Sequence, residues 1–141
     1  MLTWIIAGSL VLGAPALKNE PKPRPVDPPN GKWAVVRMTI DGYELAGDSV
    51  TQTWEFAADS RRVFVPGSET STHRATYFHH GGVLEADLDT DFGVRKAIWK
   101  VEGKTLTICM GREGKPRPTT FSAPKESGRI LVVLSSVNEF K

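Results

Sequence analysis

The sequence predicts an all-β domain: an antiparallel up-and-down β-barrel of about eight short strands, which follows an N-terminal signal segment and a proline-rich linker. Short segments in which apolar and polar residues alternate recur along the chain, and a period of two is typical of a strand with one buried face. Pairs such as Asp41-Gly42 and Gly81-Gly82 separate these segments and are typical of tight turns. No stretch shows a helical period. Closing the sheet into a barrel would leave no exposed edge.

The composition fits a single globular domain. The chain has 141 residues, of which 40% are hydrophobic and 24% charged. Its 18 Lys and Arg residues nearly balance 16 Asp and Glu residues, and the two signs are interleaved. Because nucleic-acid binding normally needs a clustered basic face, we expect no nucleic-acid partner. The sequence contains no cofactor-binding motif, and we expect no cofactor.

Residues 1–16 are predicted to be a signal peptide. Residues 1–17 form an uncharged, mostly apolar run, and Ala14-Pro15-Ala16 supplies the small residues that a signal peptidase recognises. We expect cleavage after Ala16 and a secreted or periplasmic protein. The alternative is a retained membrane anchor, but the run is shorter than the roughly 20 residues that cross a bilayer. We therefore expect no stable membrane span after cleavage.

Residues 17–31 alternate proline with charged residues and are predicted to be a linker. Proline cannot donate a backbone hydrogen bond, and it pushes the preceding residue toward extended conformations. We expect an extended, solvated spacer. The barrel domain is predicted to cover residues 32–141.

The predicted strands follow one another at short intervals. They lie at residues 32–40, 50–56, 61–65, 72–79, 83–88, 96–101, 105–110 and 129–134, with a further short strand at 119–122. The hairpin of 96–101 and 105–110, with its turn at Glu102-Gly103, is the strongest signal. In the first strand we expect one face to carry Ala34, Val36, Met38 and Ile40.

The hairpin also carries a family resemblance. The segments IWKVEGKTLTICM, GKPRPTTF and ILVVLS, together with the opening GKWAVVRMTIDGYEL, resemble an uncharacterised lipocalin-like domain that recurs in planctomycete bacteria. The resemblance covers about residues 31–135. It implies a lipocalin-like barrel on an exported protein, and it implies no particular ligand or activity.

Aromatic residues on the strands suggest where a ligand would bind. An eight-stranded barrel is just wide enough to be filled by side chains or to hold one small molecule. If a cavity exists, we expect an apolar wall with a few polar groups around it. The candidate ligand-binding residues are Gln52, Trp54, Phe56, Tyr77 and Trp99.

Arg117 is a further candidate ligand-binding residue. It lies between Pro116 and Pro118, which stiffen the backbone around it. Its guanidinium could bind a carboxylate or phosphate at the mouth of the barrel. The alternative is a structural Arg that pairs with an acidic residue such as Glu102 or Glu113, or stacks on Trp33.

The sequence gives no support for a catalytic or metal site. The acidic run from Asp87 to Asp91 begins like a calcium loop but has Phe92 and Ile98 where the loop needs Gly and Glu. The three histidines lack the further ligands that a zinc site requires. Cys109 lies in an apolar strand, where a thiol usually behaves as a small buried hydrophobe. We therefore expect a protein that is not an enzyme.

Two functions remain open from the sequence. The first is binding of a small apolar or amphipathic ligand inside the barrel. The second is an extracellular protein-interaction or structural module with a filled barrel. An open cavity would favour the first, and a filled barrel with an exposed apolar patch would favour the second.

Overall fold

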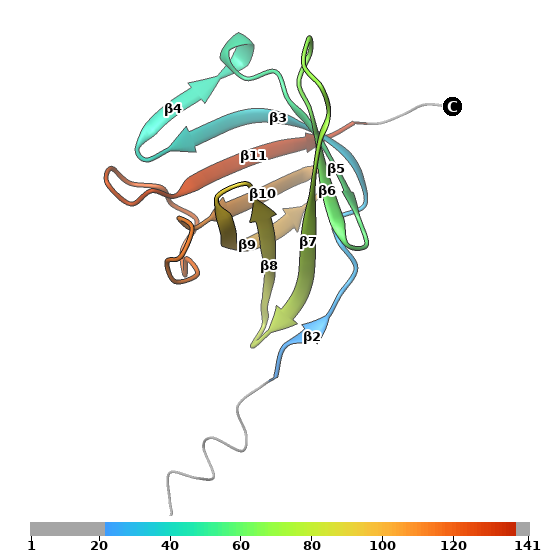
Figure 1. Cartoon of the computed structure of the whole chain (residues 1–141), viewed down its shortest axis with the longest axis vertical. Helices are drawn as coiled ribbons and strands as arrows, with labels where there is room; N and C mark the ends of the chain where they lie inside the picture. The colour runs from blue at the N-terminus through green and yellow to red at the C-terminus, as the bar shows by residue number, and fades with distance from the viewer. Residues whose placement is uncertain (1–21, 138–141) are drawn as a thin grey trace, which may run out of the picture.

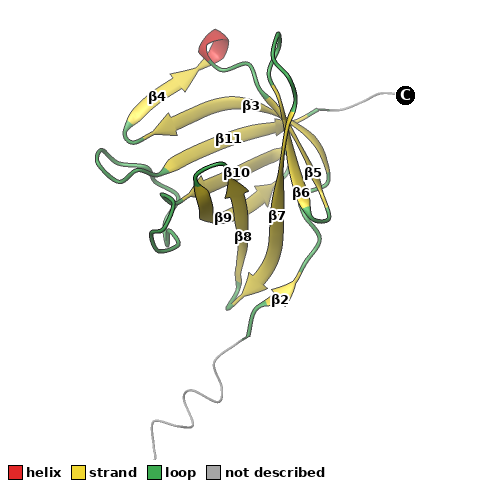
Figure 2. Cartoon of the chain, in the orientation of Figure 1, coloured by secondary structure: helices red, strands yellow, loops and turns green. Residues whose placement is uncertain are grey.

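A computed structural model describes residues 22–137 of the chain, and the predicted signal peptide lies outside the described residues. The described part is built from strands, with one short 3-10 turn, η1 (Figure 2). The elements are β2 (Arg24–Pro25), β3 (Gly31–Ile40), β4 (Tyr43–Ala46), η1 (Gly47–Ser49), β5 (Thr53–Ala57), β6 (Ser60–Phe64), β7 (Ser71–His80), β8 (Val83–Thr90), β9 (Gly93–Glu102), β10 (Thr105–Met110) and β11 (Ile130–Ser136).

Eight of these strands close into an antiparallel barrel (Figure 1). From β5 to β11 each strand pairs with the next along the chain, β3 pairs with β5, and β11 returns to pair with β3. The predicted antiparallel up-and-down barrel is therefore confirmed. The predicted strands match the observed ones within a few residues, except that residues 119–122 form no strand.

β3 changes its partner half-way along its length. Its first residues pair with β5, whereas its last four pair with β4 on the same side. The chain then leaves β4 through η1 before it enters β5. Neither β4 nor η1 was predicted, and together they divert the wall outward at one end of the barrel.

A β-bulge in β3 overturns the predicted face of that strand. The register between β3 and β11 shifts at Val36. Trp33 and Val35 are buried before the bulge and Met38 is buried after it, while Val36 is 46% exposed. One extra residue moves every later side chain to the opposite face. The prediction that Ala34, Val36, Met38 and Ile40 share one face was therefore wrong, because Met38 and Ile40 follow the bulge and no longer share the face of Ala34.

Aromatic rings fill the barrel interior toward the end at which β7 passes into β8. Trp54 lies edge-on to Phe56, Phe56 to Tyr77 and Tyr77 to Trp99, with ring centroids 6.2, 6.3 and 6.5 Å apart. Around them pack buried aliphatic side chains such as those of Leu88, Leu106, Val132 and Leu134. This end is the closed end of the barrel.

The proline-rich segment contributes to closing that end. Residues 22–30 were predicted to be a solvated spacer, but β2 pairs with the end of β7 (Figure 1). The backbone NH of Val26 donates to the Tyr77 carbonyl at 3.2 Å, and the Val26 side chain packs against the core. The segment is mostly exposed, as a spacer would be, but residues 24–26 are attached to the barrel, because proline can occupy a short edge strand that needs few donors.

The long connection from β10 to β11 covers the outside of the barrel. Cys109 and Ile98 are register partners whose side chains face outward and are nevertheless buried. The Cys109 thiol donates to the Ser122 carbonyl at 3.3 Å, and burial raises its pKa. The prediction of a buried thiol is confirmed.

Candidate functional site

A cavity lies at the end of the barrel where β8 ends and β9 begins, which we call the open end. β5 pairs only with residues 31–34 of β3, whereas β3 continues to Ile40 with β4 as its partner, so the pairing between β3 and β5 stops short of this end. The outward course of β4 widens the same opening. The resulting cavity has a volume of about 310 Å³.

The cavity wall combines an apolar surface with a group of polar side chains. Its apolar residues are Met38, Trp54, Val63, Met110 and Ile130. Its titratable residues are Arg61, His73, Arg95 and Glu113. Such a combination is typical of ligand pockets, in which a few polar groups orient a mostly apolar molecule.

Arg61 is the unusual member of this group. It shares the inward face of β6 with Val63 and is only 7% exposed. Its Nη1 donates to the Met110 sulfur at 3.8 Å, and its guanidinium lies 4.6 Å from the Trp54 ring centroid. Within residues 22–137, its Nε has no hydrogen-bond partner and its side chain forms no ion pair.

The charge of Arg61 is uncompensated in this environment. Burial lowers the pKa of Arg61 to about 10; Tyr77 raises this pKa and the charge of Arg95 lowers it, each to a smaller degree. The group is therefore still a cation at neutral pH. A buried charge without a partner is unfavourable, because it loses water without gaining an opposite charge.

Arg95 lies in the same cavity but already has a partner. Its Nε donates to a Glu113 carboxylate oxygen at 2.8 Å, and its Nη1 donates to the Gly111 carbonyl at 3.0 Å. A hydrogen bond from the backbone NH of Glu113 lowers the pKa of that carboxyl, and so does Arg95. The pair links the β10–β11 connection to the rim of the cavity.

This ion pair predicts a pH-dependent contribution to stability. A carboxyl whose folded-state pKa is lowered stabilises the fold above its ordinary pKa and loses that effect as the pH falls through the lowered pKa. We expect Glu113→Gln to lower the free energy of unfolding by about 1 kcal/mol at pH 7. The difference from the native protein should shrink on acidification, which urea unfolding at a series of pH values would measure. A difference that stays constant down to about pH 3 would contradict this role.

His73 contributes a second unsatisfied group. It shares the inward face of β7 with Ala75 and Tyr77, and its Nδ1 is buried without a hydrogen-bond partner among the described residues. Arg61 and His73 are register partners on neighbouring strands. The cavity thus holds two adjacent side chains with unused hydrogen-bonding capacity.

The predicted ligand-binding residues divide into two groups. Gln52 and Trp54 line the cavity, and the Trp54 indole NH donates to the Gln52 side-chain oxygen at 2.9 Å. Phe56, Tyr77 and Trp99 lie deeper and belong to the filled core. Tyr77 donates to the Ser60 carbonyl at 2.8 Å, and Trp99 donates to the Glu85 carbonyl at 3.2 Å. The prediction that these three surround a cavity was wrong, because they fill the interior themselves.

Arg117 lies on the outer face of the barrel, away from the cavity. Its Nη1 is 3.0 Å from the carbonyls of Ala86 and Ala97, and its Nη2 is 2.8 Å from the Asp87 carboxylate. Its Nε is 3.4 Å from the Glu85 carboxylate. Arg117 therefore does not lie at the barrel mouth, where a ligand clamp was expected. It is the structural Arg of the alternative prediction, with Glu85 and Asp87 as its acidic partners instead of Glu102 or Glu113. The guanidinium attaches the β10–β11 connection to β8 and β9.

Arg61, His73 and Arg95 were not predicted as site residues. A signal for them exists in the strand alternation. Arg61 is two residues from Val63, His73 two from Ala75, and Arg95 two from Ala97. A polar residue in phase with the apolar face of a strand points into the barrel. The sequence does not show that these three strands meet at the same end.

A second hollow, of about 470 Å³, lies outside the gap between β3 and β6, but none of its lining residues is charged. Over the described range 22–137, no three His, Cys, Asp or Glu side chains gather closely enough to hold a metal ion. In the same range no helix has the length and apolar character to cross a membrane.

Comparisons with protein-family models, curated proteins and solved structures find no match for this chain.

Proposed function

We propose that this protein is an exported binding protein, without catalytic activity, that holds a small amphipathic molecule at the open end of its barrel. The observation that carries the proposal is the contrast between the two ends. Aromatic and aliphatic side chains fill the closed end, whereas the open end keeps a cavity with an apolar wall and a few polar groups. A module that needed only a stable barrel would gain from filling this space too.

The size of the cavity limits the ligand. Ligand pockets range from about 300 to 1,000 Å³, so a cavity of about 310 Å³ suits a short chain or a single ring. Export is supported by the sequence pattern of residues 1–16. If the proposal is right, the intact mass of the exported protein will correspond to a chain that begins at Leu17. The resemblance to the planctomycete lipocalin-like family is consistent with such a barrel and names no ligand.

A cavity-blocking variant tests ligand binding directly. Trp54 borders the cavity, so a bound molecule should change the tryptophan fluorescence. We expect a saturable change with short-chain amphiphiles, and its loss in Val63→Trp, because the larger side chain occupies the cavity. Val83→Trp is the matched control, since Val83 is 41% exposed and alternates with the inward-facing Leu84 on β8. Absence of a saturable change with the whole panel in the native protein would contradict the proposal.

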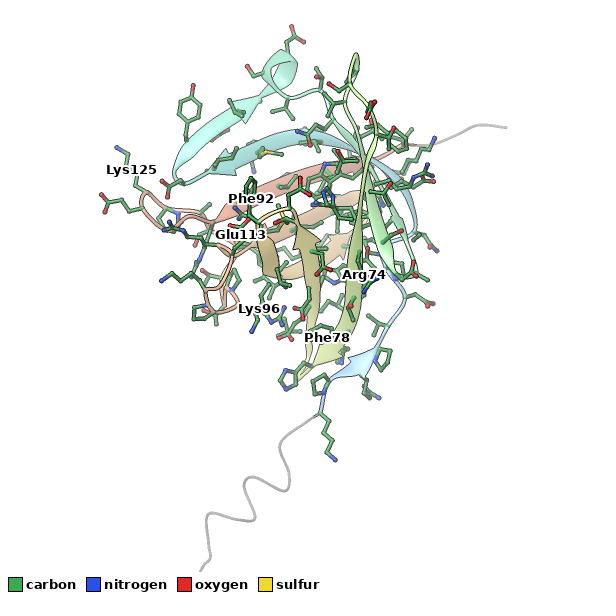
Figure 3. The ribbon with its side chains drawn as sticks, in the orientation of Figure 1. Arg74, Phe78, Phe92, Lys96, Glu113 and Lys125 are labelled. Atoms are coloured by element: carbon green, nitrogen blue, oxygen red, sulfur yellow. The ribbon has the colours of Figure 1, made fainter. Side chains whose placement is uncertain are left out.

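An interaction module is the second candidate. Phe92 is 86% exposed at the turn between β8 and β9, and it lies at the same end of the barrel as Glu113 (Figure 3). Beside it runs a hollow whose lining includes Lys96, Lys115 and Glu113, and the Glu113 carboxylate is paired with Arg95. Two lysines beside an exposed aromatic ring suit an acidic segment of an extracellular protein. For this candidate, Phe92→Ala would abolish binding of an acidic partner without changing the fluorescence response to a small ligand.

A further inference from the structure

The charge balance of the cavity indicates the kind of ligand that it would bind. With His73 counted as neutral, the lining residues Arg61, Arg95 and Glu113 sum to +1. The Glu113 carboxylate neutralises Arg95 at 2.8 Å. The unit of positive charge that remains belongs to Arg61.

The surroundings of Arg61 leave its hydrogen-bonding capacity unused. The Trp54 ring and the Met110 sulfur are soft, weakly polar neighbours, and neither is an anion. Its Nε and the neighbouring His73 Nδ1 are both buried without a partner in the described chain. A guanidinium binds a carboxylate through parallel N–H···O bonds, and these charge-assisted bonds are the strong ones.

The position of Arg61 along β6 determines the orientation in which a ligand would lie in the cavity. Arg61 pairs with Phe56 on one side and His73 on the other, below Val63. Phe56 belongs to the filled core, whereas Val63 borders the cavity. An anionic group that reaches Arg61 therefore lies at the floor of the cavity, with the rest of the molecule toward the rim.

We propose that the ligand of this barrel is a small monocarboxylate that enters carboxylate first, with its carboxylate bound by Arg61 and its apolar part against Met38, Val63 and Ile130. This inference rests on the proposed function and adds the chemical class of the ligand. A monoanion balances the single uncompensated charge. A phosphate dianion would bring a second negative charge close to Glu113, so it fits the cavity less well.

The test compares ligands that have eight carbons each and differ in the charge and chemistry of the head group. Octanoate, octan-1-ol and octyl phosphate would be titrated calorimetrically into the native protein, Arg61→Met and Arg62→Met. Arg62 is the matched control because its side chain is 49% exposed and pairs with Glu55 on the outer face. We expect the native protein to bind octanoate at least about tenfold more tightly than octan-1-ol and more tightly than octyl phosphate. Arg61→Met should bind octanoate and octan-1-ol equally, whereas Arg62→Met should keep the preference.

The outcomes separate this inference from the proposed function. Equal binding of octanoate and octan-1-ol by the native protein would overturn the role of Arg61 and leave the amphiphile-binding barrel intact. A preference that persists in Arg61→Met would also overturn it. Octyl phosphate binding at least as tightly as octanoate would overturn the monocarboxylate in favour of a phosphate. Absence of binding by all three ligands would overturn the proposed function and this inference together.

Discussion

Replacing Arg61 by Met is expected to stabilise the ligand-free protein, raising the free energy of unfolding by about 1–2 kcal/mol. The native side chain places a cation in the barrel interior with no acidic partner among the described residues. Loss of its stacking on the Trp54 ring offsets part of the gain, because such a contact contributes about 1–2 kcal/mol when desolvated. Methionine fills a similar length of irregular space with an uncharged chain.

Urea unfolding of the two proteins measures this difference through the transition midpoint at constant m-value. Arg62→Met provides the control, since an exposed ion pair contributes little and the change should stay within about 0.5 kcal/mol. A loss of stability in Arg61→Met would show that the guanidinium already has favourable contacts that compensate for its burial. A stabilised variant that no longer distinguishes an acid from an alcohol is the signature of a residue kept for binding.

Replacing Arg117 by Met is expected to have the opposite effect, lowering the free energy of unfolding by about 2–3 kcal/mol. The native guanidinium interacts with two strand carbonyls, the carboxylates of Glu85 and Asp87, and the Phe78 ring at 5.0 Å. Phe78 projects from the end of β7 in Figure 3. The Glu85 side chain is only 12% exposed, so its charge would lose a partner in a place that water reaches poorly.

Thermal or urea unfolding checks this prediction, and Arg117→Lys is the informative second variant. One ammonium cannot reproduce the several directed donors of the guanidinium, so we expect little rescue. Lys100→Met is the control, because the Lys100–Glu102 pair is exposed on both sides and should contribute little. Ligand binding should survive in Arg117→Met below its unfolding transition. A variant that is fully stable, or one that folds but loses binding, would contradict the structural role of Arg117.

The contrast between Arg61 and Arg117 shows how much of the candidate site could be predicted from the sequence. Arg61 is followed directly by Arg62, whereas Arg117 lies between two prolines, and only Arg117 was predicted to be a site residue. Its several contacts come from β7, β8 and β9, at least 20 residues earlier in the chain, so no local pattern could reveal that its charge is already used. The phase of Arg61 with Val63 is a local signal, but its significance depends on which other charges lie in the barrel.

The strands were largely predictable because their alternation is local. Trp54 and Phe56 on β5, and Leu84, Ala86 and Leu88 on β8, take the inward face that the period of two predicts. The bulge at Val36 was not predictable from β3 alone, because it appears only in the register against β11. The same holds for residues 22–30, whose prolines are compatible with a spacer and with a short edge strand.

The sequence by itself determined the all-β class, the approximate strand boundaries and the burial of Cys109, since each depends on residues within one segment. The tertiary structure decided which end of the barrel is filled and which is open, because β3 exchanges β5 for β4 as its partner toward the open end. The tertiary structure also brings Glu113 next to Arg95, whereas it places no carboxylate of the described residues next to Arg61. Pairing of charges depends on distances between strands remote in the chain, and only the closed barrel sets those distances.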